Sequence, residues 1–285
     1  MRDVPVRRPV GVVRGELARI GRRPRKRLGQ HFLSDPVIAR RIVDLAHLHG
    51  TEPVVEIGPG LGALSDILAQ RAGELWLIEV DADLAAHLRS RFATRPHVHV
   101  VHADVLTVDF AALLGPRMPA VVVANLPYNI ATAVLMALLA HPAYFTHMVL
   151  MLQREVVERL CADPGSKDYA ALSVLTQFAA RVRAALRVPP DAFVPRPKVE
   201  SDVIIVEPHR QPPVPVRDPA LLRRVIRTVF NQRRKQLANS MRPLCPDSVA
   251  TLRTARIDPT RRPETLTLAE FAALSDALGE QNSDA

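Results

Sequence analysis

The tetrapeptide Asn125-Leu126-Pro127-Tyr128 follows the apolar run 120–124 and combines residue types that can hold a planar amine. The exocyclic amine of a nucleobase such as adenine is a weak nucleophile, because its lone pair is delocalised into the ring. An Asn side-chain oxygen and a backbone carbonyl can accept both of its N–H bonds and favour a more tetrahedral nitrogen, while a Tyr ring can stack on the base. The same four residues would also fit a proline-terminated turn, so their position relative to other motifs decides between the two interpretations.

A second motif, Gly58-Pro59-Gly60-Leu61-Gly62, follows the apolar strand predicted over 54–57 and leads into a helical pattern at 61–71. Glycines at such a place allow a tight turn and a close approach of the backbone to a ligand at a helix N-terminus. The G-x-G-x-G spacing differs from the dinucleotide fingerprint, and no Gly-Lys-Ser/Thr follows, so a P-loop is excluded. Without further support, a glycine-rich turn is more often plain architecture than a ligand site.

Acidic residues follow the next two predicted strands. Glu79 ends the strand at 75–78, and an acid at the end of a second strand is the expected acceptor for the ribose hydroxyls of a nucleoside cofactor. Asp104 follows the strand at 98–102 and can accept from an adenine amino group. Other carboxylates compete for these roles, although a helix N-cap and a first-turn position explain two of them better. The competing residues are Glu56, Asp81, Asp83 and Asp109, of which Asp81 and Asp83 are the capping pair.

Four successive strand ends therefore carry Gly, Glu, Asp and Asn-Leu-Pro-Tyr. In an open α/β sheet, ligands bind outside the carboxyl ends of the strands, so this order predicts a cofactor pocket beside a nucleobase pocket. The chain resembles the class I S-adenosylmethionine-dependent methyltransferases. The resemblance implies a Rossmann-like α/β domain with a mostly parallel, doubly wound sheet, and S-adenosyl-L-methionine as the cofactor.

Three sequence blocks narrow the resemblance to the ribosomal RNA adenine N6-dimethyltransferases, and within them to the bacterial small-subunit branch. These blocks are residues 28–33, 125–130 and 193–201, and the similarity extends over roughly residues 25–275. Some members of that family carry Asn where this chain has His31. The resemblance implies that the methyl donor is contacted by His31, Leu33, Gly58, Glu79, Asp104 and Asn125.

The resemblance also implies how the target base is held. The Asn125 side chain and the Leu126 carbonyl would orient N6 within the Asn-Leu-Pro-Tyr motif that includes Pro127, and Tyr128 and Phe193 would stack on the ring. Transfer would be direct, with neither a general base nor a metal ion, because a sulfonium is already a good leaving group. The alternative for Phe193, which lies in a proline-rich loop, is that of a packing anchor.

Charge is distributed unevenly along the chain, whose net charge is +9. Residues 1–27 hold ten basic and two acidic residues, and residues 216–262 hold twelve and three. Two basic segments that flank a base-modifying pocket favour docking on a phosphate backbone over a merely solvated surface. We predict RNA contacts from Arg223, Arg227, Arg233, Arg234 and Lys235.

Hydrophobic periodicity and the positions of proline and glycine predict three parts. These are a basic, mobile N-terminal arm at 1–27, a catalytic domain at 28–212, and a small all-α RNA-docking domain at 213–285. No regular element is expected before residue 25. In the catalytic domain, predicted strands and helices alternate, and strands at 182–188 and 203–206 are expected to pair as the last two. Helices are predicted at 219–230, 232–242, 248–255 and 267–278.

The resemblance implies an enzyme that transfers methyl groups from S-adenosylmethionine to N6 of two adjacent adenosines near the 3′ end of 16S rRNA during ribosome biogenesis, and we predict this function. No apolar run approaches the roughly 20 residues of a membrane span, and the two cysteines show no metal-binding spacing. A cytoplasmic monomer without a metal is expected. Three alternatives remain: a DNA adenine methyltransferase, a large-subunit rRNA methyltransferase conferring antibiotic resistance, and a non-catalytic RNA-binding assembly factor.

Overall fold

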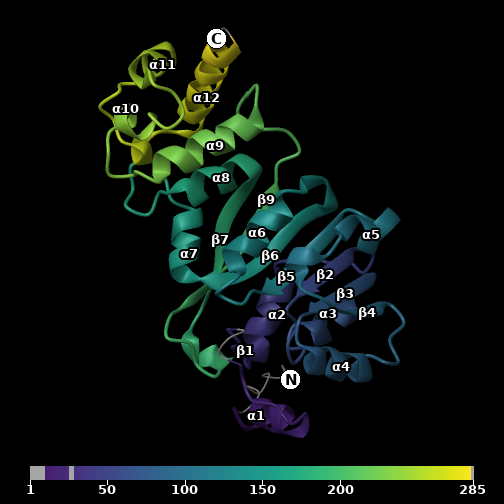
Figure 1. The fold of residues 1–285 in the computed structure, drawn as a ribbon. Helices are drawn as coiled ribbons and strands as arrows, with labels where there is room; N and C mark the ends of the chain where they lie inside the picture. The colour runs from purple at the N-terminus through teal and green to yellow at the C-terminus, as the bar shows by residue number, and fades with distance from the viewer. Residues whose placement is uncertain (1–9, 26–28, 284–285) are drawn as a thin grey trace. The chain divides into compact units, whose positions relative to one another are not determined.

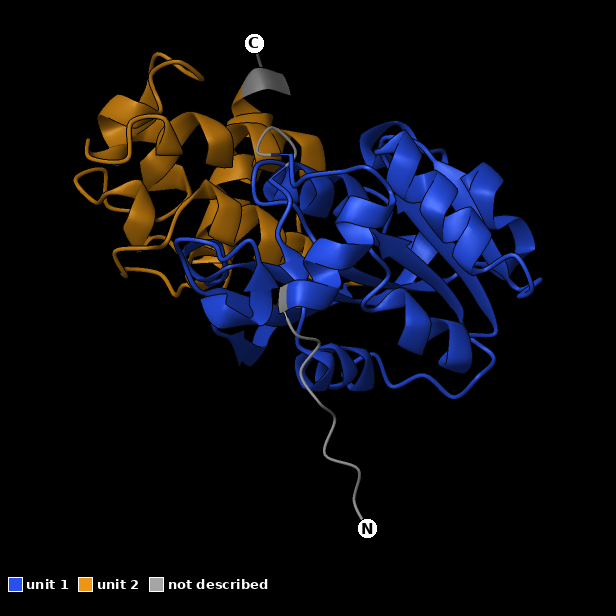
Figure 2. Cartoon of the chain, turned by 90° about the horizontal axis from the view of Figure 1, so that it is seen from below, with its two compact units in different colours: residues 1–157, 183–208 blue, residues 158–182, 209–285 orange. Residues whose placement is uncertain are grey.

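The computed structural model describes residues 10–25 and 29–283, which form two compact units (Figures 1 and 2). Unit 1 comprises residues 1–157 and 183–208, and unit 2 comprises residues 158–182 and 209–285. A seven-stranded sheet is the centre of unit 1, and unit 2 is built from helices (Figure 1).

The seven strands lie in the order β4-β3-β2-β5-β6-β9-β7. Neighbouring strands from β4 to β6 are parallel, and β9 is antiparallel to β6. The predicted fold class, an α/β unit with a mostly parallel sheet, is confirmed. Their bounds are β2 Pro53–Ile57, β3 Glu74–Glu79, β4 Val98–His102, β5 Ala120–Asn125, β6 Phe145–Gln153, β7 Ala180–Val188 and β9 Ser201–Pro208.

The central strands are apolar on both faces, as expected of strands covered on both sides. In β5 every residue from Ala120 to Ala124 is buried, and only Asn125 at the carboxyl end is partly exposed. The helices of unit 1 connect these strands, and three of them pack on one face in a single apolar cluster: α2 Pro36–Asp44, α3 Ser65–Arg71 and α4 Ala82–Arg91. The others are α1 Val10–Arg19, α5 Phe110–Leu114, α6 Ala131–Leu139 and α7 Arg154–Leu160, which runs on into unit 2.

A second, two-stranded sheet joins distant parts of the sequence. Strand β1, Phe32–Leu33, pairs antiparallel with β8, Phe193–Val194. The pairing places the start of the catalytic unit against the proline-rich loop. Strands of two residues are too short to show an alternating pattern, so the sequence does not predict this pairing. The predicted pairing of the last two long strands is confirmed, because β9 and β7 are neighbours in the large sheet.

The N-terminal segment differs from the prediction. Residues 10–19 form helix α1 instead of an arm without regular structure, while residues 1–9 and 26–28 lie outside the described part of the chain. The helix exists because Val13 and Leu17, one turn apart, are buried against Phe32, Leu61 and Leu84 of the main body of unit 1. The two apolar residues alone give no sustained period, so the sequence pattern does not reveal this helix.

Unit 2 packs its helices around aromatic and aliphatic side chains. Phe230 contacts the rings of Tyr169 and Phe271, at centroid distances of 6.2 and 5.9 Å. The Tyr169 hydroxyl donates to the Leu266 carbonyl (3.0 Å), which satisfies its buried polar atom. The helices are α8 Ala171–Ala179, α9 Pro219–Phe230, α10 Leu237–Ser240, α11 Ser248–Thr254 and α12 Leu268–Ser283.

The helix predicted over 232–242 is wrong. Turns occupy 231–235, Gln236 is extended, and only the four-residue α10 follows. The N–H groups of Leu237 and Ala238 donate to the carbonyls of Arg261 and Pro259 (2.8 and 3.1 Å) instead of to the preceding helical turn. A loop distant in the sequence therefore captures the donors that a continuous helix would need.

The compact units do not coincide with the predicted boundary at 212/213, because residues 158–182 pack with the helices of unit 2. Among the described residues, no helix is both long and apolar enough to cross a membrane.

Candidate functional site

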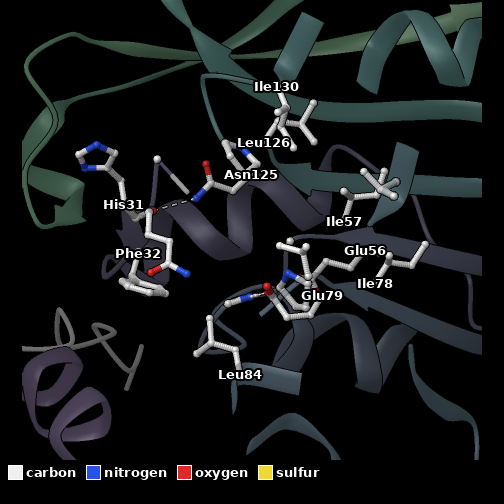
Figure 3. A pocket seen from close by; sticks show the side chains of 18 of the residues that line it. His31, Phe32, Glu56, Ile57, Ile78, Glu79, Leu84, Asn125, Leu126 and Ile130 are labelled. Carbon is white, nitrogen blue, oxygen red and sulfur yellow. Dashed lines mark hydrogen bonds between the residues drawn. The ribbon is translucent and has the colours of Figure 1, made fainter. Parts of the chain in front are cut away.

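A pocket opens at the carboxyl ends of β2, β3, β4 and β5 in unit 1 (Figure 3). It is lined by residues from all four predicted strand-end motifs and from the segment around β1. The predicted donor contacts and the Asn-Leu-Pro-Tyr motif all line it: His31, Leu33, Gly58, Glu79, Asp104, Asn125, Leu126, Pro127 and Tyr128. The structure thus brings these residues together, while their contacts with ligands stay a prediction.

The glycine-rich turn and Glu79 form one hydrogen-bonded unit. Gly58 and Gly60 have φ values of +67° and +59°, which favour glycine at both positions. The Gly60 N–H donates to Glu79 Oε2 (3.0 Å), and the Asp81 N–H donates to Glu79 Oε1 (2.9 Å). Each carboxylate oxygen keeps acceptor capacity after these bonds, so Glu79 can accept from two neighbouring hydroxyls as well.

Two buried carboxyl groups lie at the base of the pocket. Burial raises the pKa of Glu79, while hydrogen bonds from the N–H groups of Asp81 and Gly60 oppose that rise. Burial also raises the pKa of Glu56 to about 8, an effect that the nearby Ser65 hydroxyl opposes and the charges of Asp66 and Glu79 reinforce. Glu56 is therefore mostly protonated at neutral pH, and among the described residues none donates to its Oε2.

Glu56 is a feature of the site whose importance the sequence interpretation missed. It appeared there only as a competing carboxylate, without a role. The available signal was a charged residue within the buried strand Val-Val-Glu-Ile, since a fully buried Glu requires a partner or a shifted pKa.

Asn125 is oriented by the segment before β1. Its Nδ2 donates to the His31 carbonyl (3.2 Å), as the dashed line in Figure 3 shows. The amide oxygen is thereby left to accept from a ligand. The two segments are 94 residues apart in the sequence, so the fold rather than local geometry sets the direction of this amide.

Tyr128 is held from two sides. Its hydroxyl forms a hydrogen bond with the Ser201 hydroxyl (2.7 Å). Its ring stacks with that of His31, at a centroid distance of 5.6 Å and an interplanar angle of 26°. His31 Nδ1 lies 2.7 Å from the Pro195 carbonyl oxygen, so this imidazole bridges Tyr128 and the proline-rich loop. Burial raises the pKa of Tyr128, and the phenol stays protonated.

Phe193 occupies a different place from the other predicted site residues. It is 3% exposed, belongs to the apolar cluster that includes Leu33, and does not line the pocket. In this arrangement it packs as an anchor of the loop, which was the alternative left open by the sequence. Stacking on a base stays a prediction and would require the ring to leave this cluster.

The remaining acidic residues behave largely as capping residues. Asp81 caps α4, and Asp83 lies in its first turn, as predicted. Asp104 lines the pocket while one of its oxygens accepts from the Leu106 N–H (3.0 Å), so its other oxygen remains for a ligand. Within the described residues, no group of three or more His, Cys, Asp or Glu side chains could hold a metal ion.

The predicted RNA-contacting residues of unit 2 fall into two classes. Arg223, Arg227, Arg234 and Lys235 are exposed. Arg233 instead ties unit 2 together, because its guanidinium donates to the Lys167 carbonyl (2.6 Å) and lies 3.9 Å from Glu264.

A small hollow in unit 2 adds three polar side chains to this surface. It is lined by side chains from the segment where the predicted helix is interrupted, namely Gln232, Lys235, Asn239, Arg242 and Pro243. Two cationic and two amide residues thus line one hollow, at the place where the predicted helix is interrupted.

A family model and the most similar relatives described here indicate the same protein family. The model of the family described as ribosomal RNA adenine dimethylase matches residues 21–280. The ribosomal RNA small subunit methyltransferase A of Pseudomonas aeruginosa is 44% identical over 90% of this chain and 96% of its own length. The protein of the same name from Magnetococcus marinus is 46% identical over 90% of this chain and 92% of its own.

Solved structures agree on the fold. A dimethyladenosine transferase from Plasmodium falciparum superposes with a TM-score of 0.76 at 22% identity, covering 88% of this chain and 98% of its own. The 23S rRNA methyltransferase ErmE superposes with a TM-score of 0.65 at 25% identity, covering 87% and 99%.

Proposed function

The chain belongs to the ribosomal RNA adenine dimethylase family, and we propose that it methylates N6 of two adjacent adenosines near the 3′ end of small-subunit rRNA. It is a methyltransferase that uses S-adenosylmethionine. The observation that carries the proposal is the pocket where Gly58, Glu79, Asp104 and Asn125 meet at the ends of four adjacent strands.

Small-subunit rRNA is favoured as the substrate over the alternatives. The two relatives named small subunit methyltransferase A that are described above are 44% and 46% identical to this chain, whereas the large-subunit enzyme ErmE is 25% identical. A non-catalytic assembly factor would not need a complete set of donor-site residues in one pocket. We further propose a monomer acting in the cytoplasm, since these relatives are bacterial proteins and bacterial ribosomes assemble there.

The residues of the pocket fit the methyl donor. Glu79 can accept from the paired ribose hydroxyls, because its two oxygens offer about four acceptor sites and the backbone N–H groups of Gly60 and Asp81 occupy only part of them. The positive-φ glycines expose the backbone of the turn to the ligand, and Asp104 can accept from the adenine amino group of the donor. When bound, S-adenosylmethionine supplies a methyl group on a positively charged sulfur, which is a good leaving group.

The chain's own contribution to transfer is to orient the target amine. The bond from Asn125 Nδ2 to His31 leaves the amide oxygen as an acceptor for one N6 hydrogen. The Leu126 carbonyl is proposed to accept the other, which would favour a tetrahedral nitrogen with its lone pair available. Because the amide is already oriented, little reorganisation is needed in the transition state.

Tyr128 is proposed to stack on the target base. Its bond to Ser201 fixes the plane of the ring, and a fixed ring binds a base at a lower entropic cost than a mobile one. Stacking of this kind contributes about 1–3 kcal/mol per base. We propose that Phe193 provides the second face of the base site after leaving its buried position.

Unit 2 is proposed to dock on the rRNA backbone. Arg223 and Arg227 are one turn apart on the exposed face of α9, opposite its buried apolar residues. Lys235 and Arg242 converge in the hollow with the amides of Gln232 and Asn239, a set that suits a phosphate and its sugar. Arg233 is not proposed to bind phosphate, because unit 2 itself uses its guanidinium.

A methyl-transfer assay tests the function directly. Immature small subunits lacking the modification, large subunits, naked rRNA and duplex DNA are each incubated with the protein and labelled S-adenosylmethionine. Label should enter only the small-subunit particles, as N6,N6-dimethyladenosine, and an Asn125→Ala variant should transfer almost none. Label in the large subunit would establish the resistance-type activity instead, and no label in any RNA would contradict the proposal.

A further inference from the structure

The N-terminal helix α1 lies against the outer side of the donor pocket and outside the part of the chain that the family model matches, residues 21–280. Its buried side chains, Val13 and Leu17, are 2% and 4% exposed and share one face of the helix. They pack on Phe32, Leu61 and Leu84. The buried apolar residues of α1 therefore pack against residues that surround a ligand pocket.

The three residues under α1 are the same ones that form a wall of the pocket. Phe32, Leu61 and Leu84 all line it and also belong to the apolar cluster of Val13 and Leu17, so this cluster connects α1 with the ligand space. Figure 3 shows Phe32 and Leu84 on the side of the pocket where the α1 ribbon passes. They come from three separate segments, which no single element holds together.

Contacts continue from this wall to Glu79. A Cβ atom on Gly60 would lie only 3.2 Å from the Phe32 ring, so the ring packs over this glycine and leaves no room for a side chain there. The Gly60 N–H in turn donates to Glu79 (3.0 Å). A displacement of Phe32 would therefore loosen the turn that holds the ribose-binding carboxylate.

The segment after α1 adds ionic contacts that end beside the same carboxylate. Arg25 lies 3.0 Å from Asp81, and Arg22 pairs with Asp83. Asp81 caps α4 and donates its N–H to Glu79. The Asp81 carboxylate is nearly buried, so this pair is less screened by solvent than an ordinary surface pair.

We propose that α1 is a brace of the methyl-donor site, with Val13 and Leu17 as positioning residues that act through Phe32, Leu61 and Leu84. The docked helix holds the wall in the arrangement that binds the donor and slows the donor's release. The proposal rests on the donor site proposed above. It concerns donor affinity rather than methyl transfer itself, since α1 contributes no residue to the pocket lining.

The test compares two double variants of the full chain with equal added charge. Val13→Asp with Leu17→Asp would bury two carboxylates and so forces α1 off the wall. Val12→Asp with Ala18→Asp places the same charges at exposed positions of the same helix, where Val12 is 40% exposed. Calorimetry measures the Kd for S-adenosylmethionine, hydrogen exchange of residues 10–19 reports undocking, and steady-state kinetics separate KM from kcat.

The buried-charge variant should raise the Kd and the donor KM about tenfold, as expected if the binding-competent wall is populated about a tenth of the time. Its kcat at saturating donor should stay near the wild-type value, and the exposed-charge control should match the wild type in all three quantities. An unchanged Kd together with faster hydrogen exchange in residues 10–19 would overturn the proposal.

Two further outcomes are decisive. If the buried-charge variant does not fold, Val13→Ala with Leu17→Ala decides instead, because a smaller rise in Kd supports bracing and no rise overturns it. If the wild-type protein and a Glu79→Ala variant bind the donor equally, the error lies in the proposed donor site rather than in α1, which separates the two failures.

Discussion

Replacing the buried carboxyl group at the base of the pocket should change how the stability of unit 1 depends on pH. Glu56 is fully buried, and its pKa in the folded protein is about 8 against 4.5 for an ordinary Glu. When an acid has a raised pKa in the folded state, the unfolded chain ionises first, so stability falls as pH rises. Glu56 makes its full contribution to the free energy of unfolding below pH 4.5, and this contribution decreases as the pH rises from there to about 8.

The size of the effect follows from these two pKa values. Between them the folded group is protonated and the unfolded one ionised, so the free energy of unfolding decreases by about 1.4 kcal/mol per pH unit. From about pH 6 to about pH 8 the free energy of unfolding decreases by about 2 kcal/mol. The slope becomes smaller near pH 8, because Glu56 then also begins to ionise in the folded protein. Glu56→Gln removes the ionisation, so this component of the pH dependence should vanish.

Urea titrations at both pH values measure the effect. Trp76, the only tryptophan in the chain, is buried in β3 and reports on unit 1 by fluorescence. The difference in unfolding free energy between Glu56→Gln and the wild type should shift by about 2 kcal/mol in favour of the variant on going from about pH 6 to about pH 8. Glu155→Gln, at an exposed position of α7, serves as the control and should show no such shift. Parallel pH curves for Glu56→Gln and the wild type would mean that Glu56 ionises normally and that burial does not control it.

Four further changes test the site and the docking surface. Glu79→Ala should weaken donor binding by about 1.5–3 kcal/mol, because a charged acceptor is removed, and calorimetry showing unchanged affinity in a folded variant would contradict that role. Asn125→Ala should abolish most transfer while RNA binding, followed in a filter assay, stays near the wild-type level; near-normal turnover would exclude its role toward N6. Phe193→Leu keeps an apolar side chain in the core and should slow transfer with little change in the unfolding midpoint, whereas an unchanged rate would leave Phe193 as a packing anchor only. Arg234→Ala with Lys235→Ala should lower the log–log salt slope of small-subunit binding by about 0.7–0.9 for each phosphate that the variant no longer neutralises, and an unaltered slope would move docking elsewhere.

The parts of the site that the sequence predicts correctly are those with local signals. A buried parallel strand is a short apolar run, and the residue that follows it must lie at the carboxyl edge of the sheet. Gly58, Glu79 and Asn125 each follow such a run, and Asp104 follows the more exposed edge strand β4, so their convergence in one pocket was predictable. Their exact hydrogen bonds were not, because the bond between Asn125 and His31 joins segments that no local pattern relates.

Phe193 and Arg233 show what residue type alone does not reveal. An isolated aromatic in a proline-rich loop and an arginine in a basic run look like ligand contacts in sequence. The fold instead gives the first to an apolar cluster and the second to backbone carbonyls of residues 166 and 167. A guanidinium whose Nη2 donates to carbonyls within its own unit has fewer donors left for a phosphate. Nothing within the run Arg233-Arg234-Lys235 distinguishes its first member from the other two.

Helix α1 and the interrupted helix near residue 236 depart from prediction in opposite directions for one reason. The segment 10–19 contains two glycines and little periodicity, so its intrinsic helical preference is low. It is helical because Val13 and Leu17 find a surface on which to be buried. The segment 232–242 has the better local pattern, yet the carbonyls of Pro259 and Arg261 capture two of its N–H groups and interrupt it. In both cases the deciding partner is distant in the sequence, and both departures shape a proposed functional surface: the wall of the donor pocket in one, the polar hollow of unit 2 in the other.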